Sequence, residues 1–413
     1  MAFENVTLQQ RKARNGGWQV VLPAMGPRAV PWLLRGAVAL IAVCTAVGLA
    51  VLWPRGEIET RAPAGPPPDL KPAEVVSVRS VPCQNPASNR CASVVARLTG
   101  GPDKGKEVTL RVGDAGDDVP SVGDKLRLFH LDVPPGFEAN VPPYSLADYE
   151  RRTPMVWLGI AFALLVIVTG RWRGFLSLLG LGLSLLIVLF FIVPAILRGE
   201  SALAVAIVGS LAIMLTTIAL AHGVGPKSLA ACVGTAASLL LTAGLAAFAT
   251  DLTHLSGFAS EEATQLQFDV TGLSIKGLLV AGMVIGALGV LDDVTVSQAS
   301  TVMALYRANP RQGFLRLFGE GLSVGRDHIA ATVNTLVLAY AGAALPVLLV
   351  FSVGHVGFGN AINSEAVAGE IVAMLVGSIG LIAAVPLTTA LAALAARRMS
   401  PADLADAHAA HAH

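Results

Sequence analysis

The sequence predicts a polytopic α-helical membrane protein, and three observations support this fold class. The chain has 413 residues, of which 54% are hydrophobic and only 14% are charged, and its mean hydropathy is +0.65; a soluble domain carries about a quarter charged residues. Apolar runs of about 20 residues recur, and each can span a bilayer. The net charge is +1 without a long Lys/Arg block, which excludes a nucleic-acid partner and leaves the lipid bilayer as the expected environment.

We count eight transmembrane helices, arranged as one plus seven. A cytoplasmic N-terminal segment, residues 1–31, precedes helix 1 at residues 32–53, which is longer than the apolar region of a cleaved signal peptide and is interpreted as a retained anchor. Residues 153–398 form a seven-helix membrane core. Its spans lie near residues 154–170, 175–197, 201–221, 228–250, 276–306, 327–351 and 367–396.

The charges of the short loops orient these spans, because cytoplasmic loops carry the excess of Lys and Arg. Loop 251–275 is acidic and is therefore placed outside, whereas Arg198, also outside, is an exception. Both termini should be cytoplasmic, and residues 399–413 are interpreted as a disordered tail. The basic residues that indicate the cytoplasmic side are Arg11, Lys12, Arg14, Arg28, Arg35, Arg171, Arg173, Arg307, Arg311, Arg316, Arg326, Arg397 and Arg398.

Residues 54–152 differ in character from the rest of the chain and should form an extracytoplasmic β-rich domain. Alternating apolar and polar residues at 75–79, 92–98, 107–112 and 125–130, separated by Gly, Asp and Pro, indicate four or five short strands. Such strands make a small β-barrel, of which an OB-like barrel is one form, and this domain could bind an envelope partner.

Cys83 and Cys91 lie eight residues apart in this domain. An exported compartment permits their oxidation, so a disulfide is expected, and two free cysteines are the alternative. Cys44 and Cys232 lie inside predicted spans and are interpreted as small buried hydrophobic residues.

The sixth span of the prediction carries the strongest functional signal. Asp293, Ser297, Ser300 and Thr301 recur at helical spacing on one stripe, beside Asp292. An ionised carboxylate near the bilayer midplane costs about 3 kcal/mol, so it needs a partner, a proton or water. Adjacent carboxylates can bind a cation together, or one can retain a proton. The alternative is that the helix emerges earlier and the aspartates lie near the interface.

The seventh span offers a matching polar surface. It contains Asp327, Asn334 and Thr335, and Arg326 precedes it. Because the two spans are antiparallel, Asn334 and Thr335 should lie at a depth similar to that of the aspartates. Arg326 should pair with a carboxylate, bind an anion or snorkel to lipid phosphates.

Other polar or kinked positions receive structural interpretations. Pro346 and Pro386 are expected to kink their helices. Glu370 is interpreted as an interfacial residue at the start of the eighth span. His408, His411 and His413 belong to the tail rather than to a metal site.

Two segments of the chain resemble the signature segments of the YibE/F-like family of bacterial integral membrane proteins. They are Gly289–Ser300, which reads GVLDDVTVSQAS, and Gly325–Gly342 followed by Leu345–Pro346. The resemblance covers most of the chain and implies one N-terminal helix, an exported region and a multi-helix core, in the fused form of the family. It implies a multi-pass protein of the bacterial plasma membrane, and it implies no particular activity.

We therefore weigh three functions. The first is an ion-coupled transporter or permease for an unknown ion or small molecule, with a site made of Asp292, Asp293, Ser297, Thr301, Arg326, Asp327, Asn334 and Thr335. The second is an intramembrane enzyme for a lipid-linked or phosphorylated substrate; the chain lacks HExxH, GxSxG and P-loop motifs, so no catalytic residue is assigned and an enzyme is disfavoured. The third is an envelope scaffold.

No cofactor is expected apart from a coupling cation or proton. The carboxylate and hydroxyl oxygens favour hard cations over soft metals, although no particular metal is indicated. A homo-oligomer is compatible with the sequence.

Overall fold

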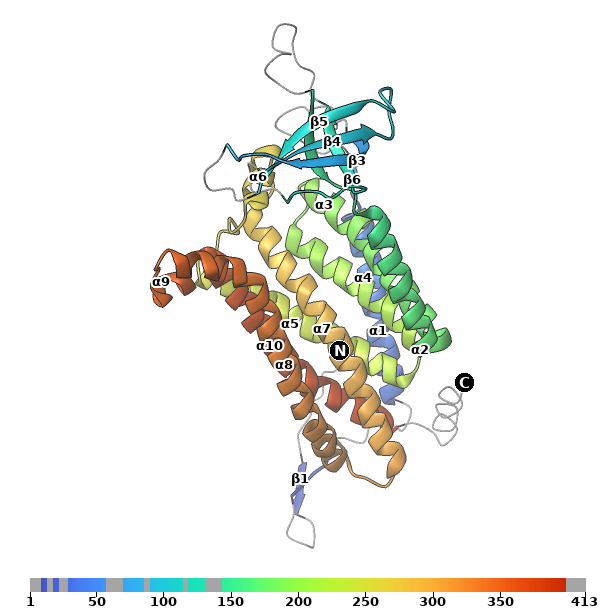
Figure 1. Ribbon diagram of the computed structural model, residues 1–413. Helices are drawn as coiled ribbons and strands as arrows, with labels where there is room; N and C mark the ends of the chain where they lie inside the picture. The colour runs from blue at the N-terminus through green and yellow to red at the C-terminus, as the bar shows by residue number, and fades with distance from the viewer. Residues whose placement is uncertain are drawn as a thin grey trace. The chain divides into compact units, whose positions relative to one another are not determined.

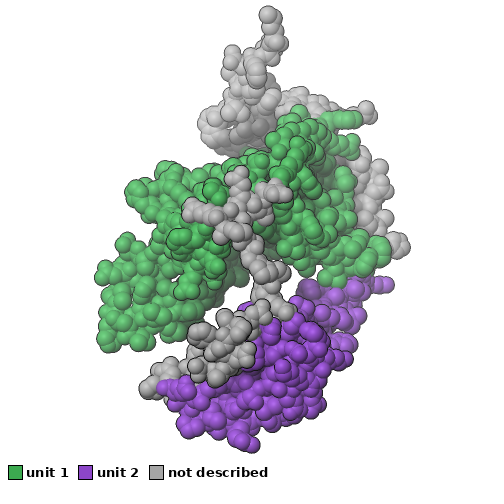
Figure 2. Space-filling view, turned by 90° about the horizontal axis from the view of Figure 1, so that it is seen from above, with its two compact units in different colours: residues 1–61, 172–413 green, residues 62–171 purple. Residues whose placement is uncertain are grey.

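The computed structural model describes residues 9–12, 18–21, 29–56, 70–84, 90–113, 118–130 and 143–398. The chain divides into two compact units, residues 1–61 with 172–413 and residues 62–171 (Figure 2). The first unit is mainly helical, and the second contains a β-sheet. The predicted tail, residues 399–413, lies outside the described residues, as does most of segment 1–31.

The helical elements follow one another along the chain as in Figure 1. They are α1 (Ala29–Val51), α2 (Arg152–Ile187), the π-helical η1 (Val188–Ile192), α3 (Val193–Leu197), α4 (Ala202–His222), α5 (Pro226–Leu252), α6 (Glu261–Asp269), α7 (Ile275–Ala308), α8 (Phe314–Val353), α9 (Phe358–Asn363) and α10 (Glu365–Ala396). Two short strands, β1 (Gln9–Lys12) and β2 (Trp18–Val21), form an antiparallel pair that the sequence did not predict.

Seven helical runs among the described residues are long and apolar enough to cross a membrane. The sequence predicted eight spans. The second and third predicted spans form a single 46-residue helical run in the structure, Arg152–Leu197. This run contains a break at Arg171, whose φ of 52° and ψ of −132° are not helical. The predicted Arg-rich turn is therefore reduced to one residue of non-helical backbone.

Helices α5, α7 and α10 pack together at the centre of the first unit. Helix α7 contacts α5, α10, α4 and α8, and it runs between α4 and α10 in Figure 1. Small residues permit the close approach: a Cβ at Gly234 of α5 would overlap Thr388 of α10, and one at Gly380 of α10 would overlap Thr242 of α5. The contact between α5 and α10 therefore depends on small residues, as is usual between helices in lipid.

Helix α8 begins earlier than predicted. The connection after α7 is only residues 309–313, and Arg316 and Arg326 lie within α8 rather than in a loop. The first turns of α8 are held by packing, because Leu317, Gly321 and Gly325 are buried. Basic residues indicated a side of the membrane here, but they did not mark where the helix begins.

The second unit contains a five-stranded antiparallel sheet that curls into a half-barrel. Its strands are β3 (Leu70–Ser80), β4 (Ala92–Leu98), β5 (Glu107–Val112), β6 (Lys125–His130) and β7 (Tyr144–Tyr149), in the order β5-β4-β3-β6-β7. Long β3 pairs with both β4 and β6, with a register shift between Val75 and Ser77. Strands β5 and β7, at the two edges, approach each other. The predicted strands at 92–98, 107–112 and 125–130 are confirmed.

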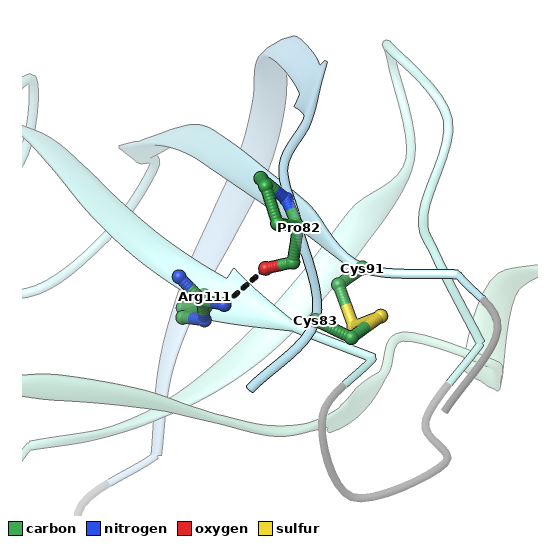
Figure 3. Close-up of a disulfide and its surroundings, with 4 residues drawn as sticks. All are labelled: Pro82, Cys83, Cys91 and Arg111. Atoms are coloured by element: carbon green, nitrogen blue, oxygen red, sulfur yellow. Dashed lines mark hydrogen bonds between the residues drawn. A yellow bond between two sulfur atoms is a disulfide. The ribbon is translucent and has the colours of Figure 1, made fainter. Parts of the chain in front are cut away.

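The half-barrel has its own core and one covalent link. Alternate residues of β5, namely Val108, Leu110 and Val112, are buried, as the period-two pattern requires. A disulfide joins Cys83 to Cys91, and beside it the Arg111 guanidinium donates a hydrogen bond to the carbonyl oxygen of Pro82 (Figure 3). This link ties the end of β3 to the start of β4.

Candidate functional site

A polar cavity of about 500 Å³ lies in the helical unit between α2, α4 and α7. Helix α7 forms one wall of this cavity. The helix begins at a cap in which Ser274 Oγ accepts a hydrogen bond from the backbone N–H of Gly277 at 3.0 Å. Its second half supplies Asp292, Asp293, Ser297 and Ser300. The remaining polar lining comes from Ser177 and Ser184 of α2 and from Thr217 and His222 of α4.

Asp292 is the most constrained group in the cavity. Its Oδ2 lies 3.1 Å from the Thr217 hydroxyl. Its Oδ1 is buried and has no hydrogen-bond partner in the described part of the chain. A carboxylate oxygen that is removed from water without a partner is expensive, so the position calls for a proton, a cation or a bound water.

The Thr217 hydroxyl has more acceptors than it can use. Besides Asp292, it lies within hydrogen-bond distance of the carbonyl oxygens of Ile213, at 2.9 Å, and Met214, at 3.2 Å. A hydroxyl has one proton to donate. It either donates a hydrogen bond to an ionised Asp292, or it donates to its own helix and accepts a hydrogen bond from the O–H of a neutral Asp292. The contact therefore suits both protonation states of the carboxyl group.

Asp293 is exposed and lines the same cavity. The two adjacent carboxylates thus have different surroundings, one held against α4 and the other open. Together with the five hydroxyls of the lining they form a set of hard oxygen donors. No group of three or more His, Cys, Asp or Glu that could hold a metal ion occurs within the described residues.

A buried hydroxyl pair fixes α7 behind the cavity. Thr295 of α7 and Thr235 of α5 are both fully buried, and their hydroxyls are hydrogen-bonded to each other. Thr295 also lies 3.1 Å from the carbonyl oxygen of Asp292, and Thr235 donates to the carbonyl oxygen of Ala231. Nothing in the sequence marks this pair, because single threonines in apolar helices give no distinct signal.

Gln298 attaches α7 to two other helices on the side away from the cavity. Its Nε2 donates to the carbonyl oxygen of Gly321 in α8 at 2.8 Å and to the hydroxyl of Thr389 in α10 at 2.7 Å. Gly325 approaches so closely that a Cβ there would lie 3.1 Å from the Gln298 amide. This buried amide holds α8 against the core.

The structure divides the predicted site residues into two groups. Asp292, Asp293 and Ser297 line the cavity together with Ser300. In contrast, Thr301 donates to the carbonyl oxygen of Ser297 without lining the cavity. The other predicted residues are exposed on α8 and do not line it either: Arg326, Asp327, Asn334 and Thr335.

The separation has a geometric cause. Helix α8 faces the core through Leu317, Gly321 and Gly325, which are spaced four residues apart. Asp327 and Asn334 lie on the opposite side of the same helix, because two residues correspond to about 200° of rotation. The partners that α8 was expected to supply come instead from α2 and α4.

Fold and site define a helical protein with several long apolar helices and an acidic, hydroxyl-lined cavity within the helical unit. The model of the YibE/F-like protein family matches residues 158–398. Since this match covers more than half of the chain, the chain belongs to the YibE/F-like family. No curated protein and no solved structure matches it.

Proposed function

We propose that the chain is an ion-coupled membrane transporter or permease in which Asp292 and Asp293 bind a proton or a small hard cation. The buried, unpartnered Oδ1 of Asp292 supports this proposal most directly. The cavity around it offers carboxylate and hydroxyl oxygens beside the apolar side chains of Leu181 and Val296. Such a donor set suits an ion that exchanges some of its water for protein oxygens.

The proposal includes eight membrane crossings. The helical run Arg152–Leu197 has 46 residues, which correspond to about 69 Å, more than twice the thickness of a hydrocarbon core. Its break at Arg171 is flanked by the basic residue Arg173, as expected for a turn at the cytoplasmic face. One crossing on each side of Arg171, together with the six other long apolar helices, gives eight crossings, arranged as one plus seven.

Contacts between distant segments agree with this topology. At the end assigned to the outside, Lys276 of α7 is paired with Asp251 of α5. The guanidinium of Arg198, which the charge rule did not place on the outer side, donates at 2.7 Å to the carbonyl oxygen of Gly56, just after α1. The guanidinium is thus hydrogen-bonded to backbone oxygens, and the ends of α1 and α3 lie on one side. In this topology the half-barrel is extracytoplasmic.

The depth of the site follows from its contact with α4. This helix has 21 residues and a length of about 31 Å, close to the hydrocarbon thickness. Thr217 lies five residues before its end, so Asp292 lies about 7.5 Å inside the cytoplasmic boundary. The aspartates therefore lie about midway between the cytoplasmic boundary and the midplane, and the cavity should receive ions from the cytoplasmic side.

Charge displacement in reconstituted membranes tests the proposal. The full chain is placed in liposomes on a solid-supported membrane, and proton, Na⁺, K⁺, Mg²⁺, Ca²⁺, Mn²⁺ and phosphate jumps are applied. We expect a current for at least one cation, lowered about a hundredfold in Asp292→Asn. The matched control is Asp327→Asn, which removes a carboxylate of α8 that lies outside the cavity.

The outcomes separate the functions. Equal currents in wild type and Asp292→Asn would overturn the assignment of the site. The absence of current for every ion would overturn ion-coupled charge transport and favour the enzyme or scaffold alternatives. Product formation from a lipid-linked substrate in detergent, without any gradient, would favour the enzyme.

A further inference from the structure

A second cavity lies at the other end of α7. It has a volume of about 280 Å³ and is lined by α6, α7, α8, α10 and the loop after α5. Two lining side chains, Glu370 of α10 and Tyr340 of α8, are polar, and the others are small or apolar. Both polar groups are half-buried.

Glu370 differs from the glutamate that begins the same helix. Glu365 accepts hydrogen bonds from Ser256 and Gly257, so its charge is compensated. Glu370 lies five residues further on, about 7.5 Å deeper along the helix. It has no hydrogen-bond partner among the described residues, and Tyr340 is the other titratable group of its cavity. Lys276, a basic residue at the same end of α7, is paired with Asp251.

Both cavities open on the same face of α7. The second cavity includes Gly282, and the first includes Gly289, Asp293 and Ser297. Intervals of seven, four and four residues place these positions on one stripe of the helix. Gly282 and Asp293 are separated by 11 residues, which correspond to about 16 Å along the axis.

The stripe between the cavities is open. A Cβ built at Gly282 or at Gly289 has no atom within 4 Å, and one at Gly286, midway between them, would meet the hydroxyl of Tyr340 at 3.6 Å. All three glycines are exposed. These three positions of the stripe therefore leave space beside α7, and the Tyr340 hydroxyl is the group that approaches it at Gly286.

We infer that Glu370 is a second proton-binding site, at the outer end of a path along α7 that leads to Asp292 and Asp293. The inference rests on the proposed function for the direction of the path. We assign a proton as the ligand because one carboxyl and one phenol are a small donor set, whereas hard divalent cations take six or more oxygen ligands. Glu370 takes up or releases its proton in the cavity, with the Tyr340 hydroxyl as its neighbour.

Carbodiimide labelling tests the proton site directly. Dicyclohexylcarbodiimide is lipid-soluble and reacts with a protonated carboxyl: the acid O–H adds across a C=N bond, and the acyl group then migrates to nitrogen as a stable N-acylurea. In the full chain in liposomes we expect this adduct on Glu370, decreasing as the pH is raised from about 5 to about 9. Glu365 should remain unlabelled. An unlabelled Glu370 at every pH would overturn the inference.

The path requires a second measurement. We expect Glu370→Gln to lower proton-jump currents about a hundredfold, whereas Glu261→Gln, which changes an exposed carboxylate of α6, leaves them unchanged. Gly289→Leu should lower the current, because its Cβ has free space beside α7 and the rest of the side chain extends from it over the stripe, and thermal unfolding checks that the variant folds. Gly244→Leu, on an exposed part of α5 with equal free space, is the matched control.

These results separate the inference from the function on which it rests. A wild-type proton current that Glu370→Gln leaves intact would overturn the path and leave the role of Asp292 standing. If Asp292→Asn loses the current and Glu370→Gln does not, the path along α7 is likewise overturned and the role of Asp292 stands. If wild type carries no current but Glu370 is labelled in a pH-dependent way, the proton site stands and the transport function fails.

Discussion

Glu365 and Ser256 hold two distant segments together by paired contacts. One carboxylate oxygen of Glu365 accepts from the backbone N–H of Ser256 at 2.7 Å and from its hydroxyl at 2.8 Å. The same oxygen accepts from the backbone N–H of Gly257, which has a φ of +90° and lies against the carbonyl oxygen of Ile275. The loop after α5 is thus fixed between the starts of α7 and α10.

Removing this carboxylate should destabilise the helical unit. We expect Glu365→Ala to lower the free energy of unfolding by about 2 kcal/mol, because several backbone and hydroxyl donors lose a charged acceptor. Glu365→Gln keeps one acceptor oxygen and should lose less. Thermal unfolding in detergent measures both variants, and an equal, negligible effect of the two would contradict the role of the contact.

The Thr217 hydroxyl should matter for ion coupling beyond its volume. Thr217→Val removes the hydroxyl that lies 3.1 Å from Asp292 and should lower the cation-driven current about tenfold. Thr217→Ser restores the hydroxyl and should restore the current. If Val and Ser variants behave alike in the liposome assay, the contact with Asp292 has no part in coupling.

The contact between α5 and α10 should not tolerate a methyl group. Gly380→Ala would push its Cβ into the Thr242 hydroxyl and should cost about 1–3 kcal/mol. Adding Thr242→Ala should recover most of this loss, because it removes the overlapping atom. Gly244→Ala, where a Cβ has open space, should be neutral or slightly stabilising. Failure of Thr242→Ala to rescue Gly380→Ala would argue against the proposed overlap.

Loss of the disulfide should weaken the half-barrel. Cys83 and Cys91 have a sequence separation of eight residues and close a short loop. Replacing both by Ser should lower the free energy of unfolding by about 2–3 kcal/mol on a chain-entropy estimate. Alkylation of the protein in intact cells, followed by mass spectrometry, should find both thiols protected until a reductant is added. Free thiols at these positions would contradict an extracytoplasmic location.

The half-barrel should lose stability in acid through Asp103. The hydroxyl of Tyr144 donates to its carboxylate at 2.6 Å, and this hydrogen bond lowers the pKa of Asp103 below its usual value of 3.8. A carboxyl group whose pKa is lower in the folded state contributes stability above its unfolded pKa and loses it as the pH falls through the folded value. We therefore expect stability to fall below about pH 4.

The Asp103 contribution can be isolated with two variants of the full chain. Asp103→Asn and Tyr144→Phe should both flatten the acid limb of the thermal stability curve followed by circular dichroism. Identical acid limbs in wild type and in both variants would show that other carboxyl groups govern the acid response.

Much of the fold could be predicted from local patterns. Strand β5 begins and ends where alternation predicted it, because one of its faces is buried and the other is not. Strand β7 was not located, since only Tyr144 of its six residues is buried and no alternation results. Helices α6 and α9 were missed because they are short and polar or mixed in composition.

The site was harder to predict than the fold. Asp292 and Asp293 stood out in the sequence because charges are rare in apolar helices. Their partner Thr217 did not, because a lone threonine in such a helix usually donates to its own backbone, which Thr217 also does. Whether α4 or α8 lines the cavity beside the aspartates depends on the side of α7 against which each helix packs. Tertiary contacts such as that of Gln298 with Gly321 decide this packing.

The strand order of the half-barrel bears on how the chain can be rearranged. Leu70, where the sheet begins, pairs with Phe129, and Tyr149, where it ends, pairs with Leu126. Both partners belong to β6, so the entering and leaving strands flank one strand and are about 10 Å apart across the sheet. The family match begins only after the sheet, at residue 158. The two ends are also offset by three residues along β6, so they lie about 14 Å apart, a distance that a linker of a few residues can span if the sheet is removed or replaced.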